Sequence, residues 1–203
     1  MKKWLLIVSL IFNLSLVAEM KVLAFAGSTR EDSYNKKLIR EAADIARGLG
    51  AQVTVIDLKD YPMPFYDADL EAKQGLPKNA KLLRNLMIAS DFIMIASPEY
   101  NSSLPPVLKN SLDWASRSDT GPSRDAFKGK RFAIMSASPG GGGGSRALVH
   151  LRGVIQDVGG EVIEEQVSVP SAHAAFNEKI KLVNLTQRQN LVTEVQALLK
   201  PKL

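Results

Sequence analysis

Short apolar runs alternate along the chain with stretches in which apolar residues recur every three or four positions. The apolar runs predict five strands, at Lys21–Ala26, Ala51–Leu58, Phe92–Ala96, Arg131–Ser136 and Glu161–Val169. The helical spacing predicts five helices, at Asn35–Leu49, Asn79–Ala89, Pro105–Ser116, Arg146–Val158 and Thr186–Lys200. The Pro-broken stretch 61–77 and the polar stretch Ser116–Gly129 are expected to be loops, and Ser145 is expected to cap the fourth helix.

Strands that are apolar throughout, each followed by a helix, indicate a parallel sheet covered on both faces. The pattern therefore predicts a doubly wound α/β domain. In such sheets, ligands bind outside the carboxyl ends of the strands, where the strand order reverses. The loops that follow the strands are the first places to look for a site.

The loop after the first predicted strand is GSTREDSYN, residues 27–35. Its short polar side chains stand beside a helix start, where free backbone N–H groups suit a phosphate, and Arg30 adds a guanidinium. A simpler interpretation is that Ser33 or Asn35 caps the helix and that Arg30 is solvated. The loop lacks the glycine–lysine pattern of an ATPase loop and the GxGxxG of a dinucleotide fold.

The loop after the third strand is SPEYNSSLPP, residues 97–106, which prolines stiffen at both ends. Backbone groups from Glu99 to Ser102 can hydrogen-bond the polar edge of a planar heterocycle, and Tyr100 can line one face. The alternative is that Tyr100 is a surface aromatic and Asn101 a turn former.

The loop after the fourth strand is SASPGGGGGSR, residues 136–146. Its five glycines either leave backbone amides free to approach a ligand closely or form a mobile loop. Strands one, three and four meet at one edge in the flavodoxin-like order 2-1-3-4-5, where FMN sits at the switch between strands one and three. The three loops together therefore predict an FMN site.

Composition narrows the function further. The 203 residues include no cysteine, which excludes disulfides, thiol catalysis and iron–sulfur clusters. The net charge of +5 comes from scattered lysines and arginines rather than a basic block, so no nucleic-acid partner is expected. Redox chemistry in this chain would need a bound cofactor.

Residues 1–19 differ from the rest, because Lys2 and Lys3 precede the apolar run WLLIVSLIFNLSLVA. This leader has the form of a secretory signal and is short for a membrane span. The alternative is that Met20 is the true start. We expect residues 20–203 to form the functional domain, with a mis-called start or an N-terminal membrane tether favoured over export.

Three segments, GSTREDSYNKKL, SPEYNSSLPPVLKNSLDW and SPGGGGGSRALVHLRGVI, resemble the hallmark segments of the NADPH-dependent FMN reductase family, and the resemblance spans Met20 to about Leu199. It implies two groups of FMN contacts. The phosphate would be held by Ser28, Arg30, Ser33 and Asn35, and the isoalloxazine would be bordered by Pro98, Glu99, Tyr100 and Asn101, with Ser138 and Gly140 approaching from the third loop.

The implied function is ping-pong reduction of free flavin, quinones or similar small electrophiles, with NADPH or NADH as the hydride donor. No catalytic side chain and no metal site is expected, and the resemblance implies a homodimer or homotetramer. Because NADPH is a cytosolic reductant, we expect a cytoplasmic location, with membrane tethering or export as the alternative if the leader is real. The alternative is a flavodoxin-like electron carrier that serves a protein partner. Such carriers are usually acidic, and the basic charge of this chain argues against it.

Overall fold

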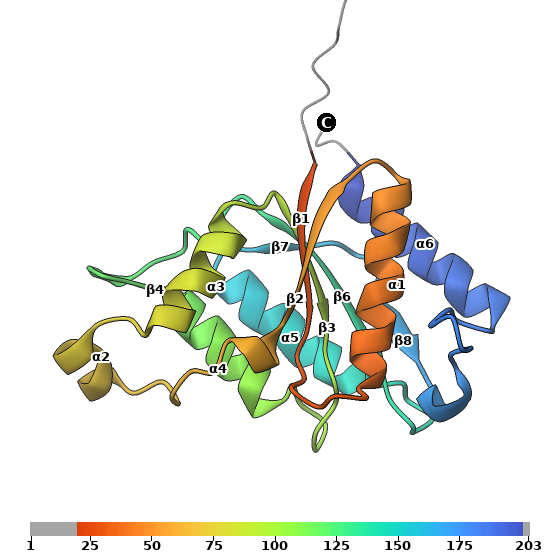
Figure 1. The fold of residues 1–203 in the computed structure, drawn as a ribbon, viewed down its shortest axis with the longest axis horizontal. Helices are drawn as coiled ribbons and strands as arrows, with labels where there is room; N and C mark the ends of the chain where they lie inside the picture. Colours follow the sequence, from red (N-terminus) through yellow and green to blue (C-terminus); the bar gives the residue numbers. More distant parts are fainter. Residues whose placement is uncertain (1–19, 201–203) are drawn as a thin grey trace, which may run out of the picture.

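A parallel sheet with helices on both faces organises the computed structural model, which describes residues 20–200 (Figure 1). The strand order is β2-β1-β3-β6-β7, and β8 pairs with a later part of β6. This order confirms the flavodoxin-like prediction. The strands are β1 (Lys21–Ala26), β2 (Gln52–Asp57), β3 (Phe92–Ala96), β6 (Arg131–Ala137), β7 (Glu161–Val162) and β8 (Val167–Val169).

The two faces of the sheet bury separate cores. Alternate residues of a strand point to opposite faces, so Val22 and Ala24 join one core while Leu23 and Phe25 join the other. Full burial of a side chain such as Phe25 contributes about 1.5–3 kcal/mol. One face carries α1 (Tyr34–Gly48) and α6 (Leu185–Leu199), and the other carries α3 (Lys78–Ile88), α4 (Pro106–Ala115) and α5 (Ser145–Asp157).

The predicted fifth strand is interrupted in the structure. β7 pairs with β6 at Arg131, and pairing resumes at Val167 opposite Met135. Between these two pairings the fifth strand contains more residues than β6 does. The extra residues form a bulge. The guanidinium of Arg152 on α5 donates hydrogen bonds to the carbonyl of Ile163 at 2.9 Å and to the side chain of Gln166 at 3.0 Å. The expectation of one continuous strand was wrong because the polar residues 164–166 (EEQ) interrupt the apolar run that it assumed.

Two predicted loops contain secondary structure. Residues 61–77, here called the arm, include α2 (Ala68–Gln74), whose start is capped by the carboxylate of Asp67. No residue of α2 is buried, and the helix projects from the sheet (Figure 1). The indole of Trp114 on α4 anchors the arm by donating to the carbonyl of Pro64 at 2.8 Å. The polar stretch after α4 forms a small hairpin of β4 (Arg117–Ser118) and β5 (Gly121–Pro122).

Two adjacent cations at the start of β6 hold helix ends on opposite faces of the sheet. The ammonium of Lys130 donates to the carbonyl of Ile88, the last residue of α3, and to that of Ser90 just beyond it, at 2.7 Å each. The guanidinium of Arg131 donates to the carbonyls of Ala197 and Leu198 at 3.0 and 2.8 Å. Cations suit these positions because the last carbonyls of a helix are unpaired and carry partial negative charge.

The leader, residues 1–19, lies outside the described residues, as do residues 201–203. Within 20–200, none of the helices combines the length and the apolar character that a membrane crossing requires.

Glu194 on α6 is buried in the core with no hydrogen bond of normal length to either carboxylate oxygen. Burial raises its pKa well above the ordinary value of 4.5, and the Val167 peptide and Arg152 only partly oppose the effect. The folded protein therefore holds this proton more tightly than the unfolded chain does. The stabilisation is present below about pH 4.5 and is lost as the pH rises.

We expect Glu194→Gln to raise the free energy of unfolding at pH 7 by at least about 1 kcal/mol, because burying the ionised Glu194 of the unfolded chain requires uptake of a proton, whereas glutamine requires none. The gain should shrink as the pH falls toward 4.5. Urea unfolding of both proteins between pH 4.5 and 8 measures it. A difference that does not change with pH would contradict the assignment.

Candidate functional site

Three loops at the carboxyl edge of the sheet surround one cleft with a volume of ≈ 170 Å³. Its lining includes eight residues predicted from the sequence, namely Ser28, Arg30, Ser33, Asn35, Pro98, Glu99, Tyr100 and Ser138. Asn101 and Gly140, also predicted, are exposed and are not part of this lining. The lining further includes Tyr34, Ala137 and Pro139, which the sequence interpretation passed over although each lies within a quoted segment.

The first loop packs tightly against α4. Gly27 donates its N–H to the carbonyl of Ala96 at 2.9 Å. A Cβ on Gly27 would lie 2.8 Å from Leu108 Cδ2, so the close approach of α4 requires glycine here. This contact fixes the place from which the loop departs.

The start of α1 is open to a ligand. Ser33 occupies the N-cap position, but its side chain makes no capping hydrogen bond, and the first turn contains no acidic residue. The N–H groups of a first helical turn have no partner within the helix, so this end attracts an anion. Of the two sequence interpretations, capping by the Ser33 side chain is not what the structure shows.

Tyr34 carries two cations near its ring. The guanidinium carbon of Arg30 lies 5.4 Å from the ring centroid and the ammonium of Lys37 lies 5.6 Å from it. Lys37 also pairs with Asp32 at 2.7 Å, and this hydrogen bond holds the pKa of Asp32 below its ordinary value. Of these two cations, Arg30 lines the cleft, at the side formed by the first loop.

The second loop contains a tight turn. Tyr100 and Ser103 exchange both backbone hydrogen bonds, at 2.9 and 3.1 Å. Asn101 and Ser102 between them have φ values of 51° and 68°. Asparagine tolerates this left-handed region better than most residues, which supports the interpretation of Asn101 as a turn former. The turn presents the half-exposed ring of Tyr100 at the rim of the cleft.

Glu99 joins the second loop to the third. Its carboxylate accepts hydrogen bonds from the backbone of Arg146 at 3.1 Å and of Ala147 at 3.4 Å, and it pairs with the Arg146 guanidinium. The hydrogen bond from the Arg146 side chain holds the pKa of Glu99 below its ordinary value. The Glu99 carboxylate therefore pairs with the free N–H groups at the start of α5. Within residues 20–200, the free N–H groups at the start of α1 have no such carboxylate and are available to another anion. Ser145, expected to be the cap, is the first helical residue, and Gly144 occupies the cap position.

The glycine run divides into two parts. Cβ atoms on Gly140, Gly141 and Gly142 would meet nothing closer than 3.8 Å, so these positions are sterically open. Gly143 and Gly144 have φ values of 61° and 87° and pack against neighbouring chain. Only the first part matches the expectation of backbone free to approach a ligand.

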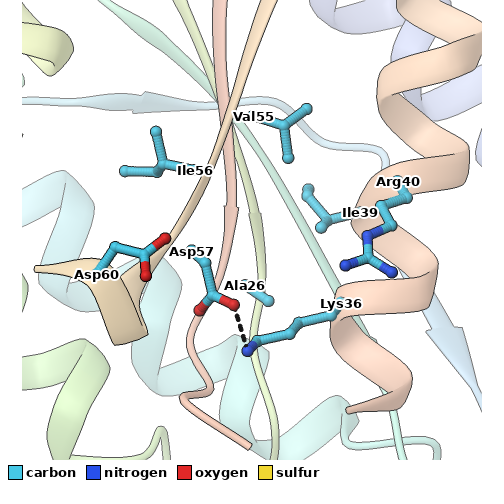
Figure 2. A pocket seen from close by; sticks show the side chains of 8 residues that line it. All are labelled: Ala26, Lys36, Ile39, Arg40, Val55, Ile56, Asp57 and Asp60. Carbon is cyan, nitrogen blue, oxygen red and sulfur yellow. Dashed lines mark hydrogen bonds and ion pairs between the residues drawn. The ribbon is translucent and has the colours of Figure 1, made fainter. Parts of the chain in front are cut away.

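A second hollow, of ≈ 230 Å³, lies on the other side of α1, against β2 (Figure 2). Ile39 and Val55 contribute to its apolar lining, and Lys36 crosses it to pair with Asp57 at 2.5 Å. Partial burial opposes ionisation of Asp57, but hydrogen bonds from Lys36 and the Lys59 backbone outweigh it and lower the pKa. The charges that line it are mixed, with Lys36 and Arg40 beside Asp57 and Asp60.

Comparisons with known proteins agree on one family. The family model described as NADPH-dependent FMN reductase matches residues 20–174. An NAD(P)H-dependent FMN reductase of Pseudomonas aeruginosa is 34% identical over 181 residues, which cover 89% of this chain and 94% of that protein. An NADPH:quinone oxidoreductase of Arabidopsis thaliana is 38% identical over 143 residues, covering 68% and 70% of the two chains.

A solved structure is also similar. FerB of Paracoccus denitrificans, a flavoenzyme NAD(P)H:(acceptor) oxidoreductase, superposes with a TM-score of 0.75 at 28% identity, covering 88% of this chain and 94% of that one.

Because the glycines of the third loop differ in packing, we expect alanine substitutions at different positions in it to have unequal effects on stability. A Cβ on Gly144 would lie 1.9 Å from Ser136 Oγ at a positive φ, so Gly144→Ala should lower the free energy of unfolding by about 2 kcal/mol or more. The control is Gly141→Ala, whose Cβ meets nothing within 4 Å and which should change stability by less than about 0.5 kcal/mol. Urea unfolding measures both. Equal effects at the two positions would contradict the close packing.

Proposed function

Because the chain belongs to the NADPH-dependent FMN reductase family, we propose that it binds FMN in the cleft and oxidises NADPH or NADH to reduce a small acceptor. Free flavin, quinones and similar electrophiles are the acceptors, and the two half-reactions follow one another in ping-pong order. The observation that carries the proposal is the open start of α1, which faces the same cleft as Arg30 and the Tyr100 turn.

The residues of the first loop fit a terminal phosphate. The unpaired N–H groups at the start of α1 and the hydroxyls of Ser28 and Ser33 supply donors, and Arg30 supplies charge. The family resemblance implies the same phosphate role for Asn35, which lies in the lining but has its side-chain amide paired with the Ala137 backbone.

The second and third loops fit the ring. Pro98 and Tyr100 line the cleft from the second loop, and Ser138 lines it from the third. The enclosed volume is below the roughly 300–1,000 Å³ of closed small-molecule sites, so a flavin ring would extend over the rim beside Tyr100. One ring face would then be open to solvent and to a second planar molecule. Asn101 and Gly140 are proposed to approach the ring from the outer parts of their loops.

These residues would hold FMN, which when bound would supply the hydride-accepting and electron-donating chemistry that links NAD(P)H to the acceptor. The chain's own residues bind and orient it. The open rim fits ping-pong order, since the hydride donor and the acceptor would bind against the same open face of the ring, one after the other. The names of the relatives support a reductase over the alternative of an electron carrier.

We propose further that the protein acts as a homodimer or homotetramer with no nucleic-acid partner, and that residues 20–203 are the functional domain. Access to NADPH favours the cytoplasmic side, with residues 1–19 as a tether or an upstream addition to a start at Met20. Mass analysis of the native amino terminus tests this, and a terminus at Glu19 would indicate cleavage and export instead.

The direct test follows the visible absorption of the purified chain while NADPH is added without oxygen. We expect a yellow protein whose flavin band bleaches and then recovers on addition of a quinone. A yellow protein that does not bleach with NADPH or NADH would support the electron carrier. A protein that stays colourless after soaking with FMN would refute the proposal.

The phosphate assignment predicts a selective effect at Arg30. Arg30→Ala should weaken FMN binding by about tenfold or more, since a charge-assisted hydrogen bond contributes roughly 1.5–3 kcal/mol. Riboflavin, which lacks the phosphate, should bind to the variant as tightly as it binds to the wild type. Flavin fluorescence quenching measures both affinities. Arg40→Ala is the control, because it removes an exposed cation of α1 that lines the other hollow. Equal loss in the two variants would contradict a phosphate contact.

A further inference from the structure

Asn35 makes a two-point contact with the backbone at the end of β6. Its side-chain amide donates to the carbonyl of Ala137 at 2.9 Å, and its side-chain oxygen accepts the N–H of Ala137 at 2.9 Å. The residue is only 3% exposed. The side chain thus pairs with the N–H and the carbonyl of Ala137 as a residue of a neighbouring strand would, although the two residues are 102 positions apart in the sequence.

The next residue makes a matching contact on the other side. Lys36 extends to β2 and pairs with Asp57, and its side chain is 8% exposed (Figure 2). Asn35 and Lys36 therefore attach the first turn of α1 to β6 and to β2, two strands separated by β1 and β3. We call this pair of contacts the helix clamp.

The helix clamp sets the positions of the neighbouring residues that line the cleft. Ser33 and Tyr34, just before Asn35, line the cleft from the first loop. Ala137 and Ser138 line it from the third loop. The Asn35–Ala137 contact joins these two walls directly, so the separation of the proposed phosphate and ring contacts depends on it.

We propose that Asn35 is a positioning residue, which acts on flavin binding through Ala137 and not as a ligand of the phosphate. The proposal rests on the proposed function for its ligand and differs from the role that the family resemblance implied. An asparagine side chain offers two donor hydrogens and two acceptor lone pairs, and the paired geometry already commits one of each to Ala137 in a buried position.

The test compares FMN with riboflavin in Asn35→Ala. A positioning residue affects both walls, so both flavins should bind about tenfold or more weakly, by similar factors, because two buried hydrogen bonds are lost. A phosphate ligand would affect FMN alone, as expected for Arg30→Ala. Loss of FMN affinity with unchanged riboflavin affinity would overturn the proposal.

Hydrogen exchange gives a readout that needs no flavin. The N–H of Ala137 is bonded to the Asn35 side chain, so its exchange in the free protein should become at least tenfold faster in Asn35→Ala. Unchanged protection of this N–H would also overturn the proposal. If the wild-type chain binds neither flavin, the proposed function fails, whereas this exchange measurement still decides whether the contact exists.

Two further variants complete the design. Asn35→Gln keeps the amide but moves it by one methylene. If Asn35 is a phosphate ligand, the variant should keep its FMN affinity; if Asn35 is a positioning residue, the affinities for both flavins should fall. This variant also replaces Asn35→Ala in the test if the alanine variant does not fold. Asn110→Ala is the matched control. Asn110 also pairs with backbone, accepting from the Tyr66 N–H at 2.8 Å and donating to the Pro64 carbonyl at 2.9 Å, but at the base of the arm. It should leave both flavin affinities unchanged, and a loss equal to that of Asn35→Ala would count against a specific role of Asn35.

Discussion

Backbone hydrogen bonding along β6 is the constraint on which the rest of the structure depends, because this strand pairs with β3 on one side and with both β7 and β8 on the other. Its first residues hold the ends of α3 and α6. Its last residue, Ala137, receives the side chain of Asn35. The strand therefore fixes the two helical layers at one end of the sheet and the walls of the cleft at the other. The function follows from this placement more than from any reactive side chain.

Most of the fold could be predicted from the sequence because it depends on local and repeated signals. Apolar strands and helical spacing fixed the bounds of α1 and α5 to within one or two residues and gave the strand order by analogy with known doubly wound sheets. The bulge between β7 and β8 was missed because the polar residues 164–166 were included in the predicted strand; Arg152 of α5 donates hydrogen bonds to this bulge. The helix α2 was missed because its seven residues bury nothing and so carry no apolar periodicity.

The candidate site was predicted as a set of loops, and eight of the named residues do line one cleft. Their individual contacts could not be predicted, because they are made between residues far apart in the sequence. Glu99 contacts the start of α5, 47 residues away, and Asn35 contacts a residue 102 positions away. Residue type indicates that such side chains seek hydrogen bonds, but it does not say whether the partner is a ligand or the chain itself.

The arm has a consequence for how this scaffold can vary. It is attached through its own small cluster, in which the buried Leu76 and the partly buried Leu70 pack with Trp114 of α4. Glu71 of α2 also pairs with Arg117 at 2.8 Å. These contact positions are constrained by packing, whereas the exposed residues of α2 between them are not. Those exposed positions can change without rebuilding the sheet, and they are the natural place to display a foreign epitope or affinity tag on the folded protein.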